Sequence, residues 1–357
     1  MIGALNKWSR FLDRLSLGYF LYRKTRRARR LPFEVTIEVT NHCNLRCRMC
    51  ARSALKRDKG FVDLHLVSKV AEEVKDEDVL VVLSGWGEPL LHPKIGEIIN
   101  ILKGKGVEVV LFTNATLLNE VISRDLIKSG LDAIIFSFDG ASKETYERLR
   151  VGASFDITCT NIINFIKLKR VEGKRKPYTI IQLVVSKDNL AEVNQFREKW
   201  TGIVDLVSIS PFSSVSGHVN EDLSPINLKY GLIEPCPWLW ISTWITWDGK
   251  VIPCCKDLNA ETVLGRVGEE RLTNIWNGEK YQRLRGEMAQ GNYEMLPYVC
   301  QKCDQMTSRY LVSKLSLVDM ARRTIRFLSS SPLHFYLKEL TRLNYQTLKM
   351  LMEHRRQ

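Results

Sequence analysis

Three cysteines lie close together near the start of the chain, at Cys43, Cys47 and Cys50, with the spacing C-x3-C-x2-C. Three thiolates on one loop can bind three irons of a cubane iron–sulfur cluster and leave the fourth iron open to a small molecule. An open metal position is more typical of catalytic sites than of structural ones. A zinc loop is the alternative, but structural zinc normally has four closed ligands, and His42 is poorly placed beside Cys43 to be one.

A glycine-rich segment follows, Ser84-Gly85-Trp86-Gly87-Glu88-Pro89-Leu90. Glycines allow backbone carbonyl groups to approach a ligand closely. Together with the carboxylate of Glu88, such carbonyls can accept hydrogen bonds from a ligand's ammonium group. By itself the segment is also compatible with a simple tight turn.

A second group of cysteines occurs late in the chain: Cys236, the adjacent pair Cys254 and Cys255, and the C-x2-C pair Cys300 and Cys303. In a reducing compartment, clustered cysteines indicate metal or redox chemistry more than disulfides. These thiols are compatible with an iron–sulfur cluster or with a zinc ribbon. The remaining cysteine, Cys159, falls in a helical stretch and is interpreted as a structural thiol.

The elements that must position these motifs alternate regularly between strands and helices. Short β-rich runs are expected at 33–40, 78–84, 107–113, 133–138, 178–186 and 203–210, and helices near 62–75, 93–103, 119–129, 142–170 and 189–200. Six such repeats predict a parallel sheet with crossover helices, in an α/β partial barrel of the (β/α)6 type. Both early motifs then fall at the carboxyl ends of strands, where active sites of such barrels lie.

A strand followed by C-x3-C-x2-C in a partial barrel resembles the radical S-adenosylmethionine (radical SAM) superfamily over roughly residues 33–210. The resemblance implies a [4Fe–4S] cluster on Cys43, Cys47 and Cys50, with SAM bound near Gly85, Gly87, Glu88, Pro89, Asn114, Ser137 and Asp139. Met49 stands where an aromatic residue is common. The adenine-side motif is not evident on the fifth strand, where Gln182 is only a polar candidate.

Residues 236–307 resemble the SPASM/twitch extension of this superfamily, whose cysteines hold auxiliary clusters. A full SPASM set has seven cysteines, whereas no cysteine follows Cys303 here. The resemblance therefore implies one auxiliary [4Fe–4S] cluster on Cys236, Cys254, Cys300 and Cys303, with Cys255 as the alternative to Cys254. Four thiolates would close this cluster to substrate, so electron transfer is its expected task.

The one-cluster arrangement is similar to that of aminocyclitol dehydrogenases of the superfamily. It implies a 5′-deoxyadenosyl radical, C–H abstraction, and oxidation or epimerisation of a carbohydrate-like or lipid-linked substrate, with a reducing flavodoxin or ferredoxin as electron donor. Two alternatives remain open: a peptide-modifying maturase, and a non-enzymatic metal-binding protein at a membrane surface. The sequence does not identify the residue that moves a proton.

The charge of the chain is concentrated at its ends. Residues 1–30 carry +8 and residues 308–357 carry +7 of a net +13, which leaves −2 for the rest. A basic amphipathic helix is expected at 1–30, a linker at 213–235 between the barrel (31–212) and the cysteine-rich unit, and a basic helical tail at 308–357.

These basic ends make an anionic membrane surface a candidate partner, and docking of their apolar faces on the body is the alternative. Nothing else in the chain resembles a nucleic-acid reader, so nucleic acid is not an expected partner. No apolar run reaches the roughly 18 residues of a membrane span, and no secretory signal is evident. We expect a cytoplasmic protein, with peripheral membrane association as an option.

Overall fold

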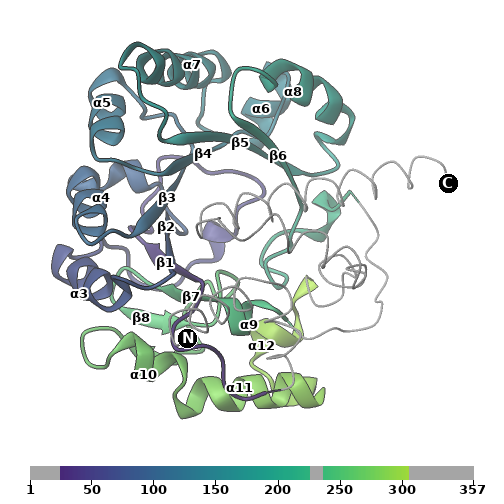
Figure 1. Cartoon of the computed structure of the whole chain (residues 1–357). Coiled ribbons are helices and arrows are strands. Elements are labelled where there is room, and N and C mark those ends of the chain that lie inside the picture. The colour runs from purple at the N-terminus through teal and green to yellow at the C-terminus, as the bar shows by residue number, and fades with distance from the viewer. Residues whose placement is uncertain (1–24, 226–235, 305–357) are drawn as a thin grey trace, which may run out of the picture.

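The computed structural model describes residues 25–225 and 236–304, and its centre is an open parallel barrel (Figure 1). Six parallel strands stand in the order β6-β5-β4-β3-β2-β1. Their bounds are β1 Glu34–Glu38, β2 Leu80–Ser84, β3 Glu108–Thr113, β4 Ala133–Ser137, β5 Tyr178–Val185 and β6 Leu206–Pro211. The predicted α/β partial barrel is confirmed, because each of the six expected β-rich runs forms one of these strands.

Helices cover the outer face of this sheet (Figure 1). They are α3 Leu64–Val74, α4 Ile95–Lys103, α5 Glu120–Lys128, α6 Lys143–Leu149, α7 Phe155–Val171 and α8 Val193–Trp200. The strands are apolar on both faces, as parallel strands buried on both sides must be. The large core lies between strands and helices, and a smaller inner cluster includes Val82, Val110 and Ile135.

The helix expected at 142–170 is two helices, with a break at 150–154 between α6 and α7. Ser154 caps the second helix, and Gly152 has the positive φ of 98° that favours glycine. Because the chain leaves the helix here, the carbonyl groups of Leu149 and Val151 are free to contact the first cysteine loop. The break is therefore part of the site described below.

The cysteine-rich unit continues the barrel sheet. Strand β7 (Ser242–Ile245) runs parallel to β1, and the short β8 (Lys250–Ile252) and β9 (Gly265–Arg266) follow as antiparallel strands to give nine in all. Its helices are α9 Trp238–Ile241, α10 Leu272–Trp276, α11 Glu279–Gln290 and α12 Tyr298–Gln301. Joining the sheet at β1 brings this unit to the strand that precedes the first cysteine loop.

The connection from the barrel is packed where it is described. Val215 and Val219 are buried, and the Ser213 and Ser214 side chains bond to Asp304 at the end of the second unit. The first part of the segment expected as a linker thus lies against both units, while residues 226–235 lie outside the described ranges.

The basic N-terminal segment differs from expectation where the structure describes it. Residues 25–30 are not helical, and they run along α10 and α11. The Ala28 amide donates to Asn277, and Trp240 donates to the carbonyl of Thr25. The helix expected at 1–30 therefore does not extend over 25–30, because this backbone bonds to the second unit. Residues 1–24 and the tail expected at 308–357 lie outside the described residues.

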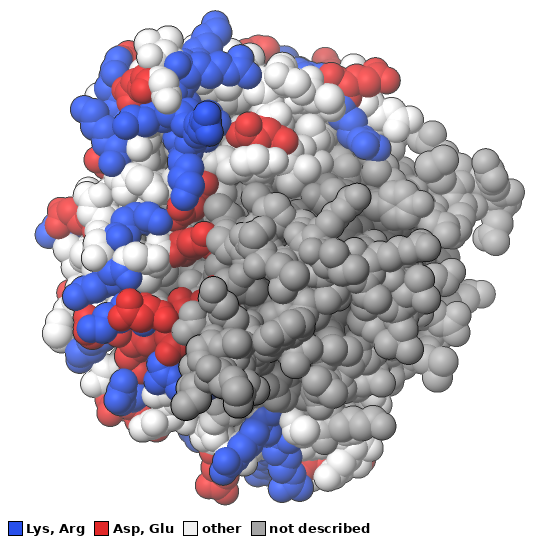
Figure 2. Space-filling model, in the orientation of Figure 1, with Lys and Arg blue, Asp and Glu red and all other residues white. Residues whose placement is uncertain are grey.

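Lys and Arg also gather over the part of the surface where Figure 1 places α5 and α7 (Figure 2). The end of α7 and the segment after it carry exposed Lys167, Arg170, Lys174, Arg175 and Lys176. None of the helices in the described ranges is both long and apolar enough to cross a membrane.

Candidate active site

The first cysteine loop follows β1 and is fixed by the break between α6 and α7. The amides of Arg46 and Arg48 each donate to a carbonyl there, Val151 and Leu149, at 2.9 Å. The Cys50 amide donates to the carbonyl of Cys47 at 3.1 Å, and the short helix η1 (Ala51–Ala54) starts immediately after. These bonds hold three half-buried thiols on one ordered loop.

The thiols of this loop interact with one another. Burial raises the pKa of Cys47 to about 11, with further contributions from Cys50 and Cys43, while Arg150 opposes the rise. Burial also raises the pKa of Cys43, although the amide of Leu45 donates to its sulfur at 3.4 Å. Three neighbouring soft donors with a cation beside them fit an anionic iron–sulfur cluster, and their partial exposure leaves room for a ligand on one side.

Asp139 orients that cation. Its fully buried carboxylate accepts from Arg150 Nε at 2.6 Å and from the amide of Val184 at 2.7 Å. Asp139 was predicted to lie near SAM. In the structure both of its oxygens bond within the protein, the carboxylate holds Arg150 beside Cys47, and contact of Asp139 with SAM stays a prediction. Arg150 lies at the break after α6 with its side chain only 12% exposed, and the sequence carried no signal for its role because one continuous helix was expected there.

Glu88 has a similar internal role. It is 2% exposed, and its carboxylate accepts from the amide of Leu90, from Thr113 Oγ1 at 2.7 Å and from the amide of Asn114 at 2.7 Å. Its own amide donates to the carbonyl of His42 at 2.8 Å. Glu88 therefore ties the ends of β2 and β3 to the first cysteine loop, and direct contact with SAM stays a prediction.

The two glycines of this loop are required by close packing. A Cβ at Gly87 would lie 2.3 Å from the carbonyl oxygen of Thr40 and 2.4 Å from that of His42. Gly85 has φ +156°, and a Cβ there would lie 2.6 Å from Cγ of Glu38. The loop can approach the end of β1 only because both positions lack side chains. Pro89 is buried and begins the short helix η2 (Pro89–Leu91).

The other predicted SAM-binding residues lie at the carboxyl ends of the next strands. The buried Asn114 donates to Asn44 Oδ1 at 3.0 Å, so it supports the first cysteine loop from β3. Ser137 ends β4, pairs in register with Gln182 on β5, and is half-buried. Gln182 donates to Ser210 Oγ at 2.7 Å. The barrel thus brings the predicted residues together at one rim.

The second cysteine set converges from three segments of the chain. Burial raises the pKa of Cys254, and Cys255, Cys300, Cys236 and Cys303 all act on it as like charges. Burial likewise raises the pKa of Cys236 to about 12, although the amides of Trp238 and Leu239 bond to its sulfur. Cys300 is acted on by Cys236 and Cys303. Cys159 lies apart from both sets, in α7 against the main core.

Cys254 and Cys255 differ in what they face. Cys236, Cys300 and Cys303 are all among the main influences on the pKa of Cys254, whereas of these three thiols Cys303 alone is among the main influences on Cys255. Cys255 instead has Lys256 as its strongest neighbouring charge. This arrangement supports Cys254 as the fourth ligand of the second set.

Lys256 and Asp304 form a buried ion pair beside this set, with side chains 5% and 10% exposed. Each partner directly follows a cysteine, Cys255 or Cys303, so the pair joins two of the converging segments. Ser213 bonds to both partners, which attaches them to the end of β6. This pair could not be predicted from the sequence because its members are 48 residues apart.

Throughout residues 25–225 and 236–304, no three Cys, His, Asp or Glu side chains converge tightly enough to surround a single metal ion. The sulfur ligands of a cubane cluster stand farther apart than the ligands of one zinc ion, because four irons lie between them.

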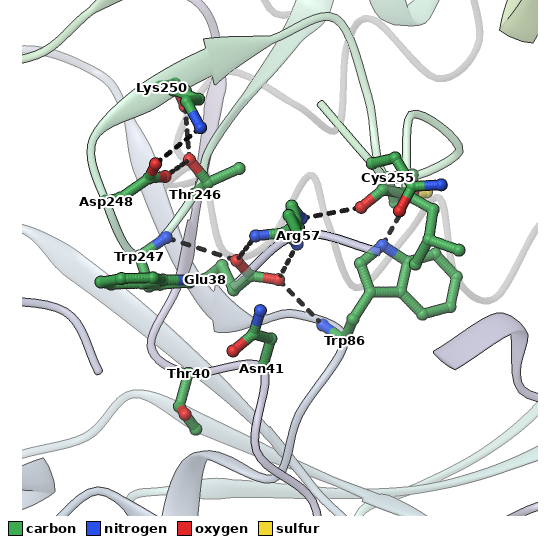
Figure 3. A network of polar contacts seen from close by, with 12 residues as sticks. Glu38, Thr40, Asn41, Arg57, Trp86, Thr246, Trp247, Asp248, Lys250 and Cys255 are labelled. Carbon is green, nitrogen blue, oxygen red and sulfur yellow. Dashed lines mark hydrogen bonds and ion pairs between the residues drawn. The ribbon is translucent and has the colours of Figure 1, made fainter. Parts of the chain in front are cut away.

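A polar network joins the two sites (Figure 3). Glu38, at the end of β1, forms two hydrogen bonds of 2.6 Å with Arg57, which follows the first cysteine loop. The Glu38 carboxylate also accepts from the amides of Trp86 and Trp247, and Arg57 Nε donates to the carbonyl of Leu258. The network thus contacts the glycine-rich loop and the second unit at once.

Comparison with known proteins assigns the family. Residues 37–198 match the Radical SAM superfamily, and residues 236–304 match SPASM, an iron–sulfur cluster-binding domain. This chain belongs to the radical SAM superfamily and carries a SPASM region. Its cofactors are accordingly SAM and [4Fe–4S] clusters, one at the radical SAM site and one auxiliary, as the sequence predicts.

Individual relatives resemble the chain over most of its length. The tungsten-containing aldehyde ferredoxin oxidoreductase cofactor-modifying protein of Pyrococcus furiosus is 26% identical, over 70% of this chain and 82% of its own. The PqqA peptide cyclase of Gluconobacter oxydans is 22% identical, over 88% of this chain and 95% of its own. The structure of Streptococcus suis SuiB bound to its precursor peptide SuiA has a TM-score of 0.62 at 16% identity, over 86% and 75% of the two chains.

Proposed function

We propose that this radical SAM enzyme modifies a peptide. The observation that supports this most is the similarity to a peptide cyclase, because it extends over 88% of this chain and 95% of that protein. A peptide maturase was the alternative in the sequence analysis. The comparisons favour it over the carbohydrate-like or lipid-linked substrate that the one-cluster pattern predicted.

At the first site, we assign Cys43, Cys47 and Cys50 as the cluster ligands. When bound, the cluster and SAM supply an organic radical that abstracts a hydrogen atom from a C–H bond. The protein's own contribution is positional: Glu88 fixes the glycine-rich loop against the first cysteine loop, and Asp139 holds Arg150 beside Cys47. SAM is proposed to lie on the rim formed by Gly85, Gly87, Pro89, Asn114 and Ser137.

At the second site, we assign Cys236, Cys254, Cys300 and Cys303 as ligands of the auxiliary cluster. Four thiolates leave no open iron, so the proposed task is to accept an electron from the substrate. Lys256 acts electrostatically on this set and is held there by Asp304. A nearby fixed cation stabilises added negative charge, which favours electron acceptance.

The electron for the first cluster requires an external donor, and we propose an acidic flavodoxin or ferredoxin. Arg46 and Arg48 flank Cys47 and are exposed, and Arg148 and Lys187 extend the same exposed surface. Asp188 pairs with Arg48 at 2.8 Å and with Arg148 at 3.9 Å, which leaves this surface, here called the entry surface, at net +3. Its charge is complementary to an acidic redox partner.

Oxidation of a sugar-like alcohol is the second candidate function. The observation in its favour is the number of cysteines in the second set, which in the described residues is enough for one auxiliary cluster. A single acceptor suffices for a two-electron oxidation in which the substrate radical loses one electron and one proton. The described cysteines are free thiols, which is compatible with the proposed cytoplasmic location. Peripheral membrane association stays a prediction for segments outside the described residues.

Deuterium transfer distinguishes the two substrate classes. Reconstituted enzyme would be incubated anaerobically with SAM, reductant and either perdeuterated peptides encoded beside its gene or perdeuterated aminocyclitols. We expect deuterium in 5′-deoxyadenosine, detected by mass spectrometry, only with a peptide, together with a mass change in that peptide. Transfer from the aminocyclitol alone would reverse the order of the two candidates. The Cys43, Cys47 and Cys50→Ala triple variant is the control for radical-independent exchange.

A further inference from the structure

The indole of Trp86, in the middle of the glycine-rich loop, makes a contact that the site described so far does not include. Its indole Nε1 donates to the carbonyl of Cys255 at 3.0 Å, across 169 residues of sequence (Figure 3). Cys255 directly follows Cys254, the proposed fourth ligand of the auxiliary cluster. One side chain of the proposed SAM loop is therefore bonded to the peptide next to an auxiliary ligand.

The backbone of the same residue is bonded to the network in Figure 3. The Trp86 amide donates to Glu38 at 3.4 Å, and Glu38 pairs with Arg57, which in turn bonds the carbonyl of Leu258 at 2.8 Å. Glu38 is fully buried and the Arg57 side chain is 9% exposed. The loop at Trp86 and the segment 255–258 are thus joined twice, once through the indole and once through a buried charge pair.

Packing adds a third connection. The Trp86 ring packs against an apolar cluster that includes Ala51 and Leu258, and Met49 packs against the same cluster. Met49 and Ala51 flank Cys50 of the first site, and Leu258 belongs to the auxiliary segment. A displacement of this ring would therefore disturb packing near both proposed clusters, because close-packed interiors transmit such shifts.

We propose that Trp86 is a positioning residue that couples SAM binding to the order of the auxiliary segment 254–258. A ligand that immobilises residues 84–90 immobilises the indole and its partner carbonyl at Cys255, so fluctuations of both segments decrease together. The coupling rests on the proposed SAM role of the loop. Its consequence is that the auxiliary segment is most ordered when SAM is in place, before the substrate must give up an electron.

Hydrogen exchange of the holoenzyme tests this coupling without turnover. Both clusters would be reconstituted anaerobically, and amide exchange would be followed by mass spectrometry with and without SAM, in the absence of reductant. In the wild type we expect SAM to slow exchange in 84–90 and also in 254–258, each by several-fold. In Trp86→Phe, which keeps a ring but lacks the indole N–H, we expect the SAM effect to remain in 84–90 and to decrease clearly in 254–258, where the connection through Glu38 and Arg57 persists.

Trp247→Phe is the matched control. It removes an indole hydrogen bond of similar length, from Nε1 to the carbonyl of Asp58 at 3.2 Å, while the Trp247 amide keeps its bond to Glu38. That bond does not involve the glycine-rich loop, so both SAM effects should persist. Iron content equal to wild type would verify that each variant is loaded.

The outcomes separate the coupling from the proposed SAM site. Protection of 84–90 without any at 254–258 in the wild type would overturn the coupling and leave the SAM site standing, and this arm does not depend on any variant folding. A Trp86→Phe protein that keeps both effects would also overturn it. Absence of protection at 84–90 itself would overturn the SAM site, and the coupling with it.

Discussion

The two cysteine sites of this molecule are built in opposite ways. The first set occupies one loop, from Cys43 to Cys50, between a strand and a short helix. The second set is collected from three segments between Cys236 and Cys303, and burial raises the pKa of Cys236, Cys254 and Cys300. A local loop leaves one side open to a ligand, whereas a site gathered from three segments encloses its metal.

Both sites nevertheless share one electrostatic arrangement. Each set of thiols has a buried cation beside it, and a buried carboxylate holds that cation in place. Arg150 and Asp139 have these roles at the first site, and Lys256 and Asp304 at the second. The difference between the sites therefore lies in access, and the cation of each pair is placed where it can attract the negative charge that an iron–sulfur cluster brings.

The largest expected effect comes from removing the ligands of either site. The Cys43, Cys47 and Cys50→Ala triple variant should lose reductive SAM cleavage down to background, because no open iron remains. Cys254→Ala should keep SAM cleavage without substrate and lose the auxiliary cluster. Iron analysis after anaerobic reconstitution should give about eight irons in the wild type and about four in either variant.

Cys255→Ala and Cys159→Ala are the controls for this experiment, and both should keep about eight irons. If Cys255→Ala kept only about four irons while Cys254→Ala kept about eight, Cys255 and not Cys254 would be the fourth ligand of the auxiliary cluster. If the wild type held only about four irons, the second cysteine set would hold no iron–sulfur cluster, and a zinc-stabilised unit would be favoured there.

Breaking the carboxylate–cation pair of the second site should have the next largest effect. Asp304→Ala leaves Lys256 buried without this partner, which should cost about 3–5 kcal/mol of unfolding free energy. Denaturant unfolding of the reconstituted protein would measure it. The exposed pair Arg266–Glu269, at 3.3 Å in the same unit, is the control, and Glu269→Ala should cost at most about 1 kcal/mol.

A double variant distinguishes lost attraction from an uncompensated charge. Lys256→Met combined with Asp304→Leu should recover most of the stability lost in Asp304→Ala, because two apolar side chains can replace a buried ion pair. A double variant as unstable as the single one would show that the bonds from Asp304 to Ser213 and Ser214 matter more than the charges.

The same contrast explains how much the sequence could predict. A cluster site could be predicted at Cys43, Cys47 and Cys50 because these residues lie close together in the sequence. The six strand–helix repeats also predict the barrel that positions them. The register of β7 beside β1 could not be foreseen, because such a pairing depends on the whole fold. For the same reason Arg57 and Lys256, whose partners are distant in sequence, carried no visible signal, and Glu88 and Asp139 were predicted at the right rim without their internal partners.

A smaller effect is expected from adding a methyl group at Gly87, in the glycine-rich loop of the first site. Gly87→Ala would force a methyl group against two backbone carbonyls, at 2.3 and 2.4 Å, and should cost about 1–3 kcal/mol and weaken SAM binding. Equilibrium binding of SAM to the reconstituted protein is the measurement. Gly106→Ala is the control. Nothing lies within 4 Å of a Cβ placed there, so only the cost of the positive φ at this position applies.

The smallest effect should come from the entry surface, which affects the first site alone. Arg46→Gln with Arg148→Gln should slow reduction of the first cluster by an acidic flavodoxin about 3- to 10-fold at low salt, because complementary charge steers encounter. The difference should vanish at high salt, where exposed charges are screened. Stopped-flow absorbance under anaerobic conditions would follow the reaction.

Lys174→Gln with Arg175→Gln provides the matched control for this last experiment. It removes the same charge from the exposed segment after α7, away from the first cysteine loop. If steering acts through the entry surface, this control should reduce at the wild-type rate. Equal slowing in both double variants would mean that net charge alone attracts the donor, and that electrons reach the first site without a dedicated docking surface.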